Sequence, residues 1–258
     1  MADHRLVMGQ ELARAKKRAP SADKDVEAAL DWLKRRGTKS VRDGMARYAL
    51  PSGNAFGVSV SNIQLLAKRL GKSHELAAGL WKTGWHEARM LAAYVDEPER
   101  VTPSQMDRWC REFDNWGICD TICFVLFDRT SHAWAKVTQW SERNEEFVKR
   151  GAFALLWGLT VHDKGSGDKP FVAGLRLIEK AAADERHFVK KAVNMALRAT
   201  GKRNPALNAA AVATAKRLAA SSLPQARWTG QNALRELTSP SVLRRMLQKR
   251  KVGEKPLR

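Results

Sequence analysis

Two side chains four residues apart, Trp116 and Asp120, have the types and spacing to bind a cation. The segment Trp116–Phe127 has the apolar periodicity of a helix, and residues four apart lie on one side of a helix. An indole face attracts a cation through its quadrupole, and a carboxylate attracts it through its charge. On spacing alone, the pattern favours a Trp116 that packs in the core and an Asp120 that pairs with a neighbouring Lys or Arg.

A short basic element occurs twice, because Phe147–Ala152 is echoed 41 residues later by Phe188–Val193. Its cations are Lys149 and Arg150 in the first copy and Lys190 and Lys191 in the second. A repeat of about forty residues is typical of stacked helix pairs. Arginine binds phosphate with two parallel hydrogen bonds, so we expect Arg150 to contact a phosphate. For the lysines, a solvated helix face is the alternative.

The overall charge favours a polyanionic partner. The 258 residues include 46 Lys and Arg against 27 Asp and Glu, which gives a formal net charge of +19. Residues 201–258 hold 13 basic residues and two acids, Glu236 and Glu254, so this segment alone carries 13 − 2 = +11. Such a field attracts nucleic acid, and the binding should weaken as salt rises.

The composition, 44% hydrophobic and 28% charged, is that of an ordinary globular protein. No apolar run is long enough to span a membrane, and Met1–Pro20 lacks the apolar core of a secretory signal. The three cysteines, Cys110, Cys119 and Cys123, form no zinc-type spacing. We therefore expect buried free thiols, no metal, and a cytoplasmic protein that associates with the nucleoid when it binds DNA.

Nearly the whole chain has the periodicity of short helices. The expected helices are Ala22–Arg36, Ser59–Leu70, Ser73–Trp81, Trp85–Val95, one from Pro103, Trp116–Phe127, Ser131–Trp140, Asn144–Leu159, Lys169–Ala182, His187–Thr200, Pro205–Ala220, Pro224–Leu237 and Pro240–Arg250. Thr102 is an expected N-cap and Gly71 an expected C-cap. The pattern predicts an all-α protein, a right-handed superhelical solenoid of HEAT-like helix pairs over residues 1–250 with a basic tail at 251–258. An irregular helical bundle is the alternative.

In order and spacing, a set of motifs resembles the DNA alkylation repair family, the AlkD-like DNA glycosylases with HEAT-like repeats. The motifs are Phe56-Gly57-Val58, Leu80-Trp81, Trp85-His86-Glu87-Ala88-Arg89, Trp116 with Asp120, Lys149-Arg150, Lys190-Lys191-Ala192-Val193-Asn194 and Ala196-Leu197-Arg198. The resemblance extends from about Val41 to Leu237. It implies a protein that excises cationic purines, such as 3-methyladenine and 7-methylguanine, from double-stranded DNA without base flipping. We expect this chemistry to need no cofactor, and a monomer is the expectation for a solenoid with polar ends.

The resemblance also implies roles for individual residues. Asp120 matches the family's catalytic aspartate, Trp116 the first of two tryptophans that contact the deoxyribose, and Arg150 the arginine on the DNA backbone. Lys149, Lys190 and Lys191 are expected at the same DNA surface. Met195 occupies the position of the second tryptophan. Methionine can cover a sugar but offers no π face to a developing cation.

Two other functions stay open at this stage. The departure at Met195 also suits a protein that binds damaged or branched DNA without cutting the glycosidic bond, and a HEAT-type scaffold for protein interactions is a further alternative. His86 and Glu87 could in principle act as an acid–base pair. We expect instead that Glu87 complements the N-terminus of its helix and that His86 pairs across repeats.

Overall fold

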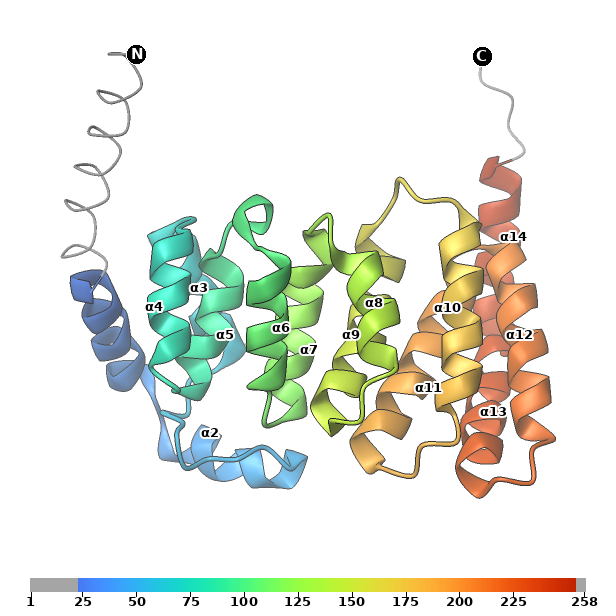
Figure 1. Ribbon diagram of the computed structural model, residues 1–258, viewed down its shortest axis with the longest axis horizontal. Coiled ribbons are helices and arrows are strands. Elements are labelled where there is room, and N and C mark those ends of the chain that lie inside the picture. Colours follow the sequence, from blue (N-terminus) through green and yellow to red (C-terminus); the bar gives the residue numbers. More distant parts are fainter. Residues whose placement is uncertain (1–22, 254–258) are drawn as a thin grey trace, which may run out of the picture. The chain divides into compact units, whose positions relative to one another are not determined.

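The computed structural model describes residues 23–253 of the chain (Figure 1). Met1–Pro20, where no secretory signal is expected, and residues 254–258 of the expected basic tail lie outside the described residues. The chain divides into two compact units, and the boundary between them lies after Val101. Each unit is described here by itself.

The first unit contains short helices. Residues 23–36 are helical and are followed by α2 (Lys39–Gly44), η1 (Met45–Tyr48), α3 (Val60–Leu70), α4 (His74–Lys82), α5 (His86–Val95) and η2 (Pro98–Arg100). Both α3 and α4 pack against α5. The apolar periodicity predicts α3, α4 and α5 to within two residues at each end. It does not predict α2 and η1, because α2 buries none of its side chains and so has no apolar periodicity.

Glu87 in the first turn of α5 binds a loop rather than its own helix end. Its carboxylate accepts backbone N–H groups from Phe56 at 3.0 Å, Gly57 at 2.7 Å and Val58 at 3.0 Å, and the residue is only 1% exposed. Gly57 has a φ of +83°, a conformation that favours glycine. Glu87 lies in the first turn of α5, where its charge complements the helix N-terminus as expected, but its hydrogen bonds go to the N–H groups of this loop, which the sequence did not predict.

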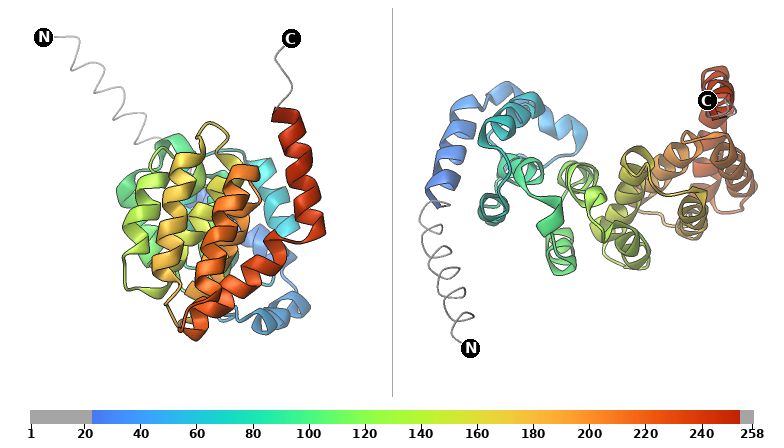
Figure 2. Two further views of the ribbon diagram at one scale, coloured as in Figure 1. Left: turned by 90° about the vertical axis from the view of Figure 1, so that its right-hand side faces the viewer. Right: turned by 90° about the horizontal axis from the view of Figure 1, so that it is seen from above.

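The second unit is a stack of helix pairs. Its elements are α6 (Pro103–Arg111), α7 (Trp116–Val125), η3 (Phe127–Arg129), α8 (Ala133–Ser141), α9 (Glu146–His162), α10 (Asp168–Ala181), α11 (His187–Gly201), α12 (Pro205–Ala219), α13 (Pro224–Leu237) and α14 (Pro240–Gly253). One layer is formed by α7, α9, α11 and α13, which pack in that order, and the other by α8, α10 and α12 (Figure 2). The helix α14 packs on α12 and α13.

The ends of these helices are specified by local sequence. The expected N-cap Thr102 accepts a hydrogen bond from the Gln105 amide, and Pro103 occupies the first turn of α6. Asn115 caps α7 and Asn204 caps α12 in the same way. The expected C-cap Gly71 ends α3 with a φ of +73°. Because each signal lies within a few residues of the boundary it sets, the sequence predicts these ends well.

The duplicated element begins two adjacent helices of one layer. Its first copy opens α9 and its second opens α11, and the rings of Phe147 and Phe188 are 5.4 Å apart between their centroids. The apolar residues that follow, Val148 and Val189, are both buried. Every regular element in residues 23–253 is a helix. The predicted all-α fold of HEAT-like helix pairs is thereby confirmed. None of the helices in this range has the length and apolarity to cross a membrane.

Candidate nucleic-acid interface

Asp120 and Arg150 form a bidentate ion pair between α7 and α9. The Nε of Arg150 donates to Oδ1 of Asp120 at 2.9 Å, and its Nη2 donates to Oδ2 at 2.7 Å. A third bond runs from Nη1 of Arg150 to the carbonyl oxygen of Phe188 in α11, at 2.7 Å. The side chain of Arg150 is 6% exposed and that of Asp120 is 15% exposed. One arginine therefore ties three adjacent helices of the layer together.

The surroundings of Asp120 set its charge state through two opposing effects. Burial raises the pKa of its carboxyl above the ordinary value, while the charge and hydrogen bonds of Arg150 counteract that rise. Both oxygens of Asp120 accept hydrogen bonds from Arg150, so the alternative in which Asp120 pairs with a neighbouring arginine is confirmed. The Asp120 side chain keeps 15% exposure, and binding of a ligand cation there stays a prediction.

Trp116 is the first residue of α7 and is partly exposed. Asn115 precedes it as the N-cap and accepts a hydrogen bond from the Ile118 amide at 3.0 Å, so the start of the helix is firmly set. Because Asp120 lies one turn further along α7, the indole and the carboxylate share one side of the helix. Both residues thus lie on the predicted helix one turn apart, and cation binding between them stays a prediction.

The other expected contacts lie on α9 and α11, around the same pair. The ammonium of Lys149 is 3.5 Å from a carboxylate oxygen of Asp184. Lys190 and Lys191 lie over the ring of Trp228 in α13, at 5.1 and 5.2 Å from its centroid. Met195, one turn beyond Lys191 on α11, is partly exposed. Binding of DNA by Arg150 and these lysines stays a prediction. In the ligand-free structure, Arg150 and Lys149 are held by carboxylates.

Three cross-helix pairs of side chains, one after another along the chain, connect α7 and η3 to α9. The first is Asp120 with Arg150. The second is Phe124 stacked on Trp157, with 4.2 Å between ring centroids. The third is a hydrogen bond between the buried Asp128 of η3 and Nδ1 of His162. Sequence reasoning did not identify the second and third pairs. Phe124 lies four residues after Asp120 and Trp157 seven after Arg150, and this helical spacing was the available signal.

The cysteines lie behind this surface. Cys110, Cys119 and Cys123 are free and buried, as the sequence predicts. The thiols of Cys119 and Cys123 donate to carbonyl oxygens of Phe147 and Gly151 in α9, at 3.7 and 3.5 Å. Burial raises the pKa of the Cys123 thiol well above its ordinary value. In the described residues, no group of three His, Cys, Asp or Glu side chains is arranged to hold a metal ion.

Comparison with known proteins agrees with the fold. A solved structure described as "a new family of proteins related to the HEAT-like repeat DNA glycosylases with affinity for branched DNA structures" superposes with a TM-score of 0.69. The two chains are 20% identical, and the match covers 81% of this chain and 93% of the other, so the likeness shows the fold. No curated protein matches the chain. A family model described as "DNA alkylation repair enzyme" matches residues 29–229. Since this match spans well over half of its length, the chain belongs to the DNA alkylation repair enzyme family.

Proposed function

We propose that the protein is a DNA glycosylase that hydrolyses the N-glycosidic bond of cationic alkylated purines in double-stranded DNA. The observation that carries the proposal is the carboxylate of Asp120, which is fixed by Arg150, is 15% exposed, and lies one helical turn from Trp116. A buried anion that is held in place stabilises a developing positive charge without having to reorganise.

The chemistry asks little else of the protein. When the bond from C1′ to the purine nitrogen breaks, its electron pair neutralises the positive charge of the alkylated base, so no acid is needed on the leaving group. Positive charge then develops on the sugar, where the carboxylate of Asp120 stabilises it. Water adds to C1′ and gives up a proton, and Asp120 is the carboxylate available to orient that water. The indole of Trp116 covers the sugar and interacts with its positive charge.

Arg150 has a second role in this proposal, besides the phosphate contact that the family resemblance implies. Its two bonds to Asp120 orient the carboxylate before DNA arrives and favour the ionised form, against the rise in pKa that burial causes. Lys190 and Lys191, next to Trp228, supply further positive charge on the same layer. Met195 covers the sugar from α11 without a π face, so we expect slower excision than a tryptophan there would give.

An excision assay on methylated duplex DNA tests this function. The wild type is expected to release 7-methylguanine, and Asp120→Asn is expected to lose that release while it retains DNA binding. A thermal melt of Asp120→Asn serves as the folding control, because the amide leaves one of the two Arg150 bonds without an acceptor. A wild-type protein that releases no alkylated base would refute the proposal.

The second candidate function is a non-catalytic binder of branched or damaged DNA. Met195 favours it, and affinity for branched DNA is what the description of the structural neighbour states for that protein. On this reading, Asp120 and Arg150 serve only to hold the helices together. Met195→Trp separates the two functions. A large gain in excision indicates a catalytic site limited at this position, whereas tight binding to a four-way junction with no excision by either protein indicates a binder.

A further inference from the structure

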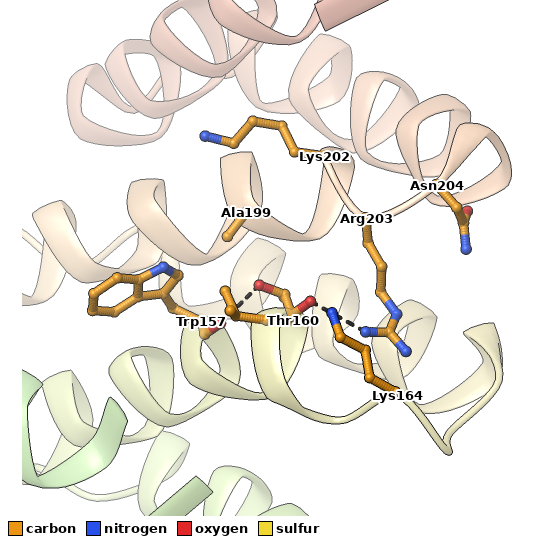
Figure 3. Close-up of a pocket in the computed structure, with 8 residues that line it drawn as sticks. Trp157, Thr160, Lys164, Ala199, Lys202, Arg203 and Asn204 are labelled. Carbon is orange, nitrogen blue, oxygen red and sulfur yellow. Dashed lines mark hydrogen bonds between the residues drawn. The ribbon is translucent and has the colours of Figure 1, made fainter. Parts of the chain in front are cut away.

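A cavity of about 510 Å³ opens on the same layer, beyond the candidate site (Figure 3). It lies between the C-terminal part of α9 and the junction of α11 with α12. Its described lining residues are Trp157, Thr160, Val161, Lys164, Ala199, Lys202, Arg203 and Asn204. Figure 3 shows Trp157 at one end and Lys164 with Arg203 toward the other. The size is within the range of pockets that bind small organic ligands.

The charge of this lining selects for an anion. Lys164, Lys202 and Arg203 contribute three cations, and none of the described lining residues carries a carboxylate. Three carboxylates border the lining without belonging to it. Glu236 is shared between Lys202 at 2.6 Å and Arg198, Asp168 accepts a hydrogen bond from Asn204 at 2.7 Å, and Asp163 interacts electrostatically with Arg203. Lys164 is exposed, and it forms no ion pair with another of the described residues. It is therefore the cation best placed to meet a ligand.

The cavity wall is built to hold its shape. Nη1 of Arg203 donates to the carbonyl oxygen of Thr160 and Nη2 to that of Ser166, both at 3.1 Å, which fastens the loop that carries Lys164. Asp163 in that loop accepts the Ser166 amide at 2.8 Å and the indole N–H of Trp134 at 2.9 Å. The turn that carries Lys164 is thus already ordered, so a ligand that binds there has less loop entropy to overcome.

Trp157 adds an aromatic surface to this cationic site. Its ring is stacked on Phe124 and lines the cavity, so the indole is oriented before any ligand binds. An aromatic wall beside cations suits a ligand that has both a planar base and a phosphate. We propose that this cavity binds one nucleotide, with its base on Trp157 and its phosphate at Lys164 and Arg203.

The distance along the helices indicates which nucleotide this is, and this step rests on the proposed function. Trp157 follows Arg150 by seven residues on α9, which corresponds to a rise of roughly 10 Å. Ala199 likewise follows Met195 by one turn on α11. For a strand that runs parallel to α9 with the duplex rise of about 3.4 Å per nucleotide, the cavity lies about three nucleotides from a nucleotide at Asp120. A paired base cannot leave its stack at low cost, so the occupant is expected to be unpaired.

Fluorescence anisotropy with undamaged DNA tests the cavity. The probes are a duplex with a three-nucleotide single-stranded gap and the same duplex fully paired, each titrated with the full-length protein. Lys164→Ala is expected to weaken binding of the gapped DNA several-fold more than binding of the paired DNA. It should also lower the salt slope on gapped DNA by about one. Lys216→Ala is the matched control, because it removes the same charge from an exposed side chain near the end of α12, in the other layer.

Trp157 is tested with two variants, since its ring also packs on Phe124. Trp157→Phe keeps an aromatic ring there and should bind gapped DNA nearly as well as wild type, whereas Trp157→Leu should bind it about tenfold more weakly. Equal losses on both DNAs in Lys164→Ala, or no loss at all, would overturn the proposal. Displacement of gapped DNA by dAMP, but not by inorganic phosphate, would show that a free nucleotide enters as well. No displacement by dAMP would show that the occupant belongs to DNA.

The glycosylase proposal and the cavity proposal fail independently. The anisotropy measurement needs no alkylated base and no bond cleavage, so a wild type without excision leaves it intact. Conversely, if Lys164→Ala still releases 7-methylguanine and binds gapped DNA as tightly as wild type, the cavity proposal is refuted and the glycosylase proposal stands.

Discussion

Removal of Arg150 tests the arrangement of the candidate site most directly. Arg150→Ala deletes two hydrogen bonds to Asp120 and one to the carbonyl of Phe188, and it leaves a largely buried carboxylate without its cation. Removing one partner of a buried ion pair lowers the free energy of unfolding by about 3–5 kcal/mol. Because the Asp120 side chain is 15% exposed, water compensates in part, so we expect a loss near the lower limit, about 3 kcal/mol.

A double-mutant cycle separates the pair from the packing around it. The cycle uses Arg150→Ala, Asp120→Ala and the double variant, each unfolded in urea at pH 7 and followed by circular dichroism. We expect a coupling of about 2 kcal/mol, because the second substitution removes a charge that the first has left unpaired. Arg217 and Glu179 form a control pair with the same bidentate geometry, at 2.7 and 2.8 Å, on an exposed surface. Their coupling should stay below about 1 kcal/mol.

The cycle can also refute the reasoning. A coupling at Asp120 and Arg150 no larger than that of the exposed control pair would mean that the bonds seen between them do not hold the carboxylate. Arg150 would then be free to serve a phosphate alone. A large coupling together with unchanged excision in Arg150→Ala would separate the structural role of Arg150 from catalysis.

Three further predictions concern stability. Burial raises the pKa of Asp128 to about 6, so the folded state binds this proton more tightly than the unfolded state does. The free energy of unfolding should therefore fall as pH rises from about 4 through 6, by roughly 3 kcal/mol at most. Asp128→Asn should flatten this fall in urea unfolding at pH 4 and 7, and an equally steep profile would contradict the assignment. Glu87→Gln turns an amide N–H₂ toward the backbone donors of residues 56–58 and should lower the stability of the fold by about 1–3 kcal/mol, measured in a thermal melt. An unchanged melting temperature would show that the loop does not need the charge. Gly230→Ala places a Cβ 2.2 Å from the Ala219 nitrogen in the α12–α13 contact and should lose about 1–3 kcal/mol. Gly53→Ala, in a turn with open space around it and without a positive φ, is the near-neutral control.

The fold was predictable from the sequence because its determinants are local. Apolar periodicity and caps such as Thr102 and Gly71 act within one or two turns, and they place the helices within a few residues of their observed ends. The duplicated element predicts that α9 and α11 are equivalent neighbours, which the Phe147–Phe188 contact confirms. The short helix α2 escaped prediction because it lies outside the apolar core.

The candidate site was predictable in its residues but not in its pairings. Asp120 and Arg150 are thirty residues apart, and helical spacing within α7 says nothing about which side chain of α9 faces it. The partners of Glu87 are backbone N–H groups, which have no signature in side-chain type. The cavity at Trp157 arises from a helix end, a loop and a junction, so its lining becomes apparent only when these segments are placed together.

The three cross-helix pairs limit how this part of the chain can vary in length. A single residue inserted within α7 or α9, between one pair and the next, would turn every later side chain by about 100° around its helix. Phe124 would then no longer face Trp157, and Asp128 would lose His162. Insertions and deletions in relatives should therefore gather in the connection at residues 142–145, outside the helices, and be rare between Asp120 and Asp128. Alignment of related sequences would reveal this register as a stretch of constant length.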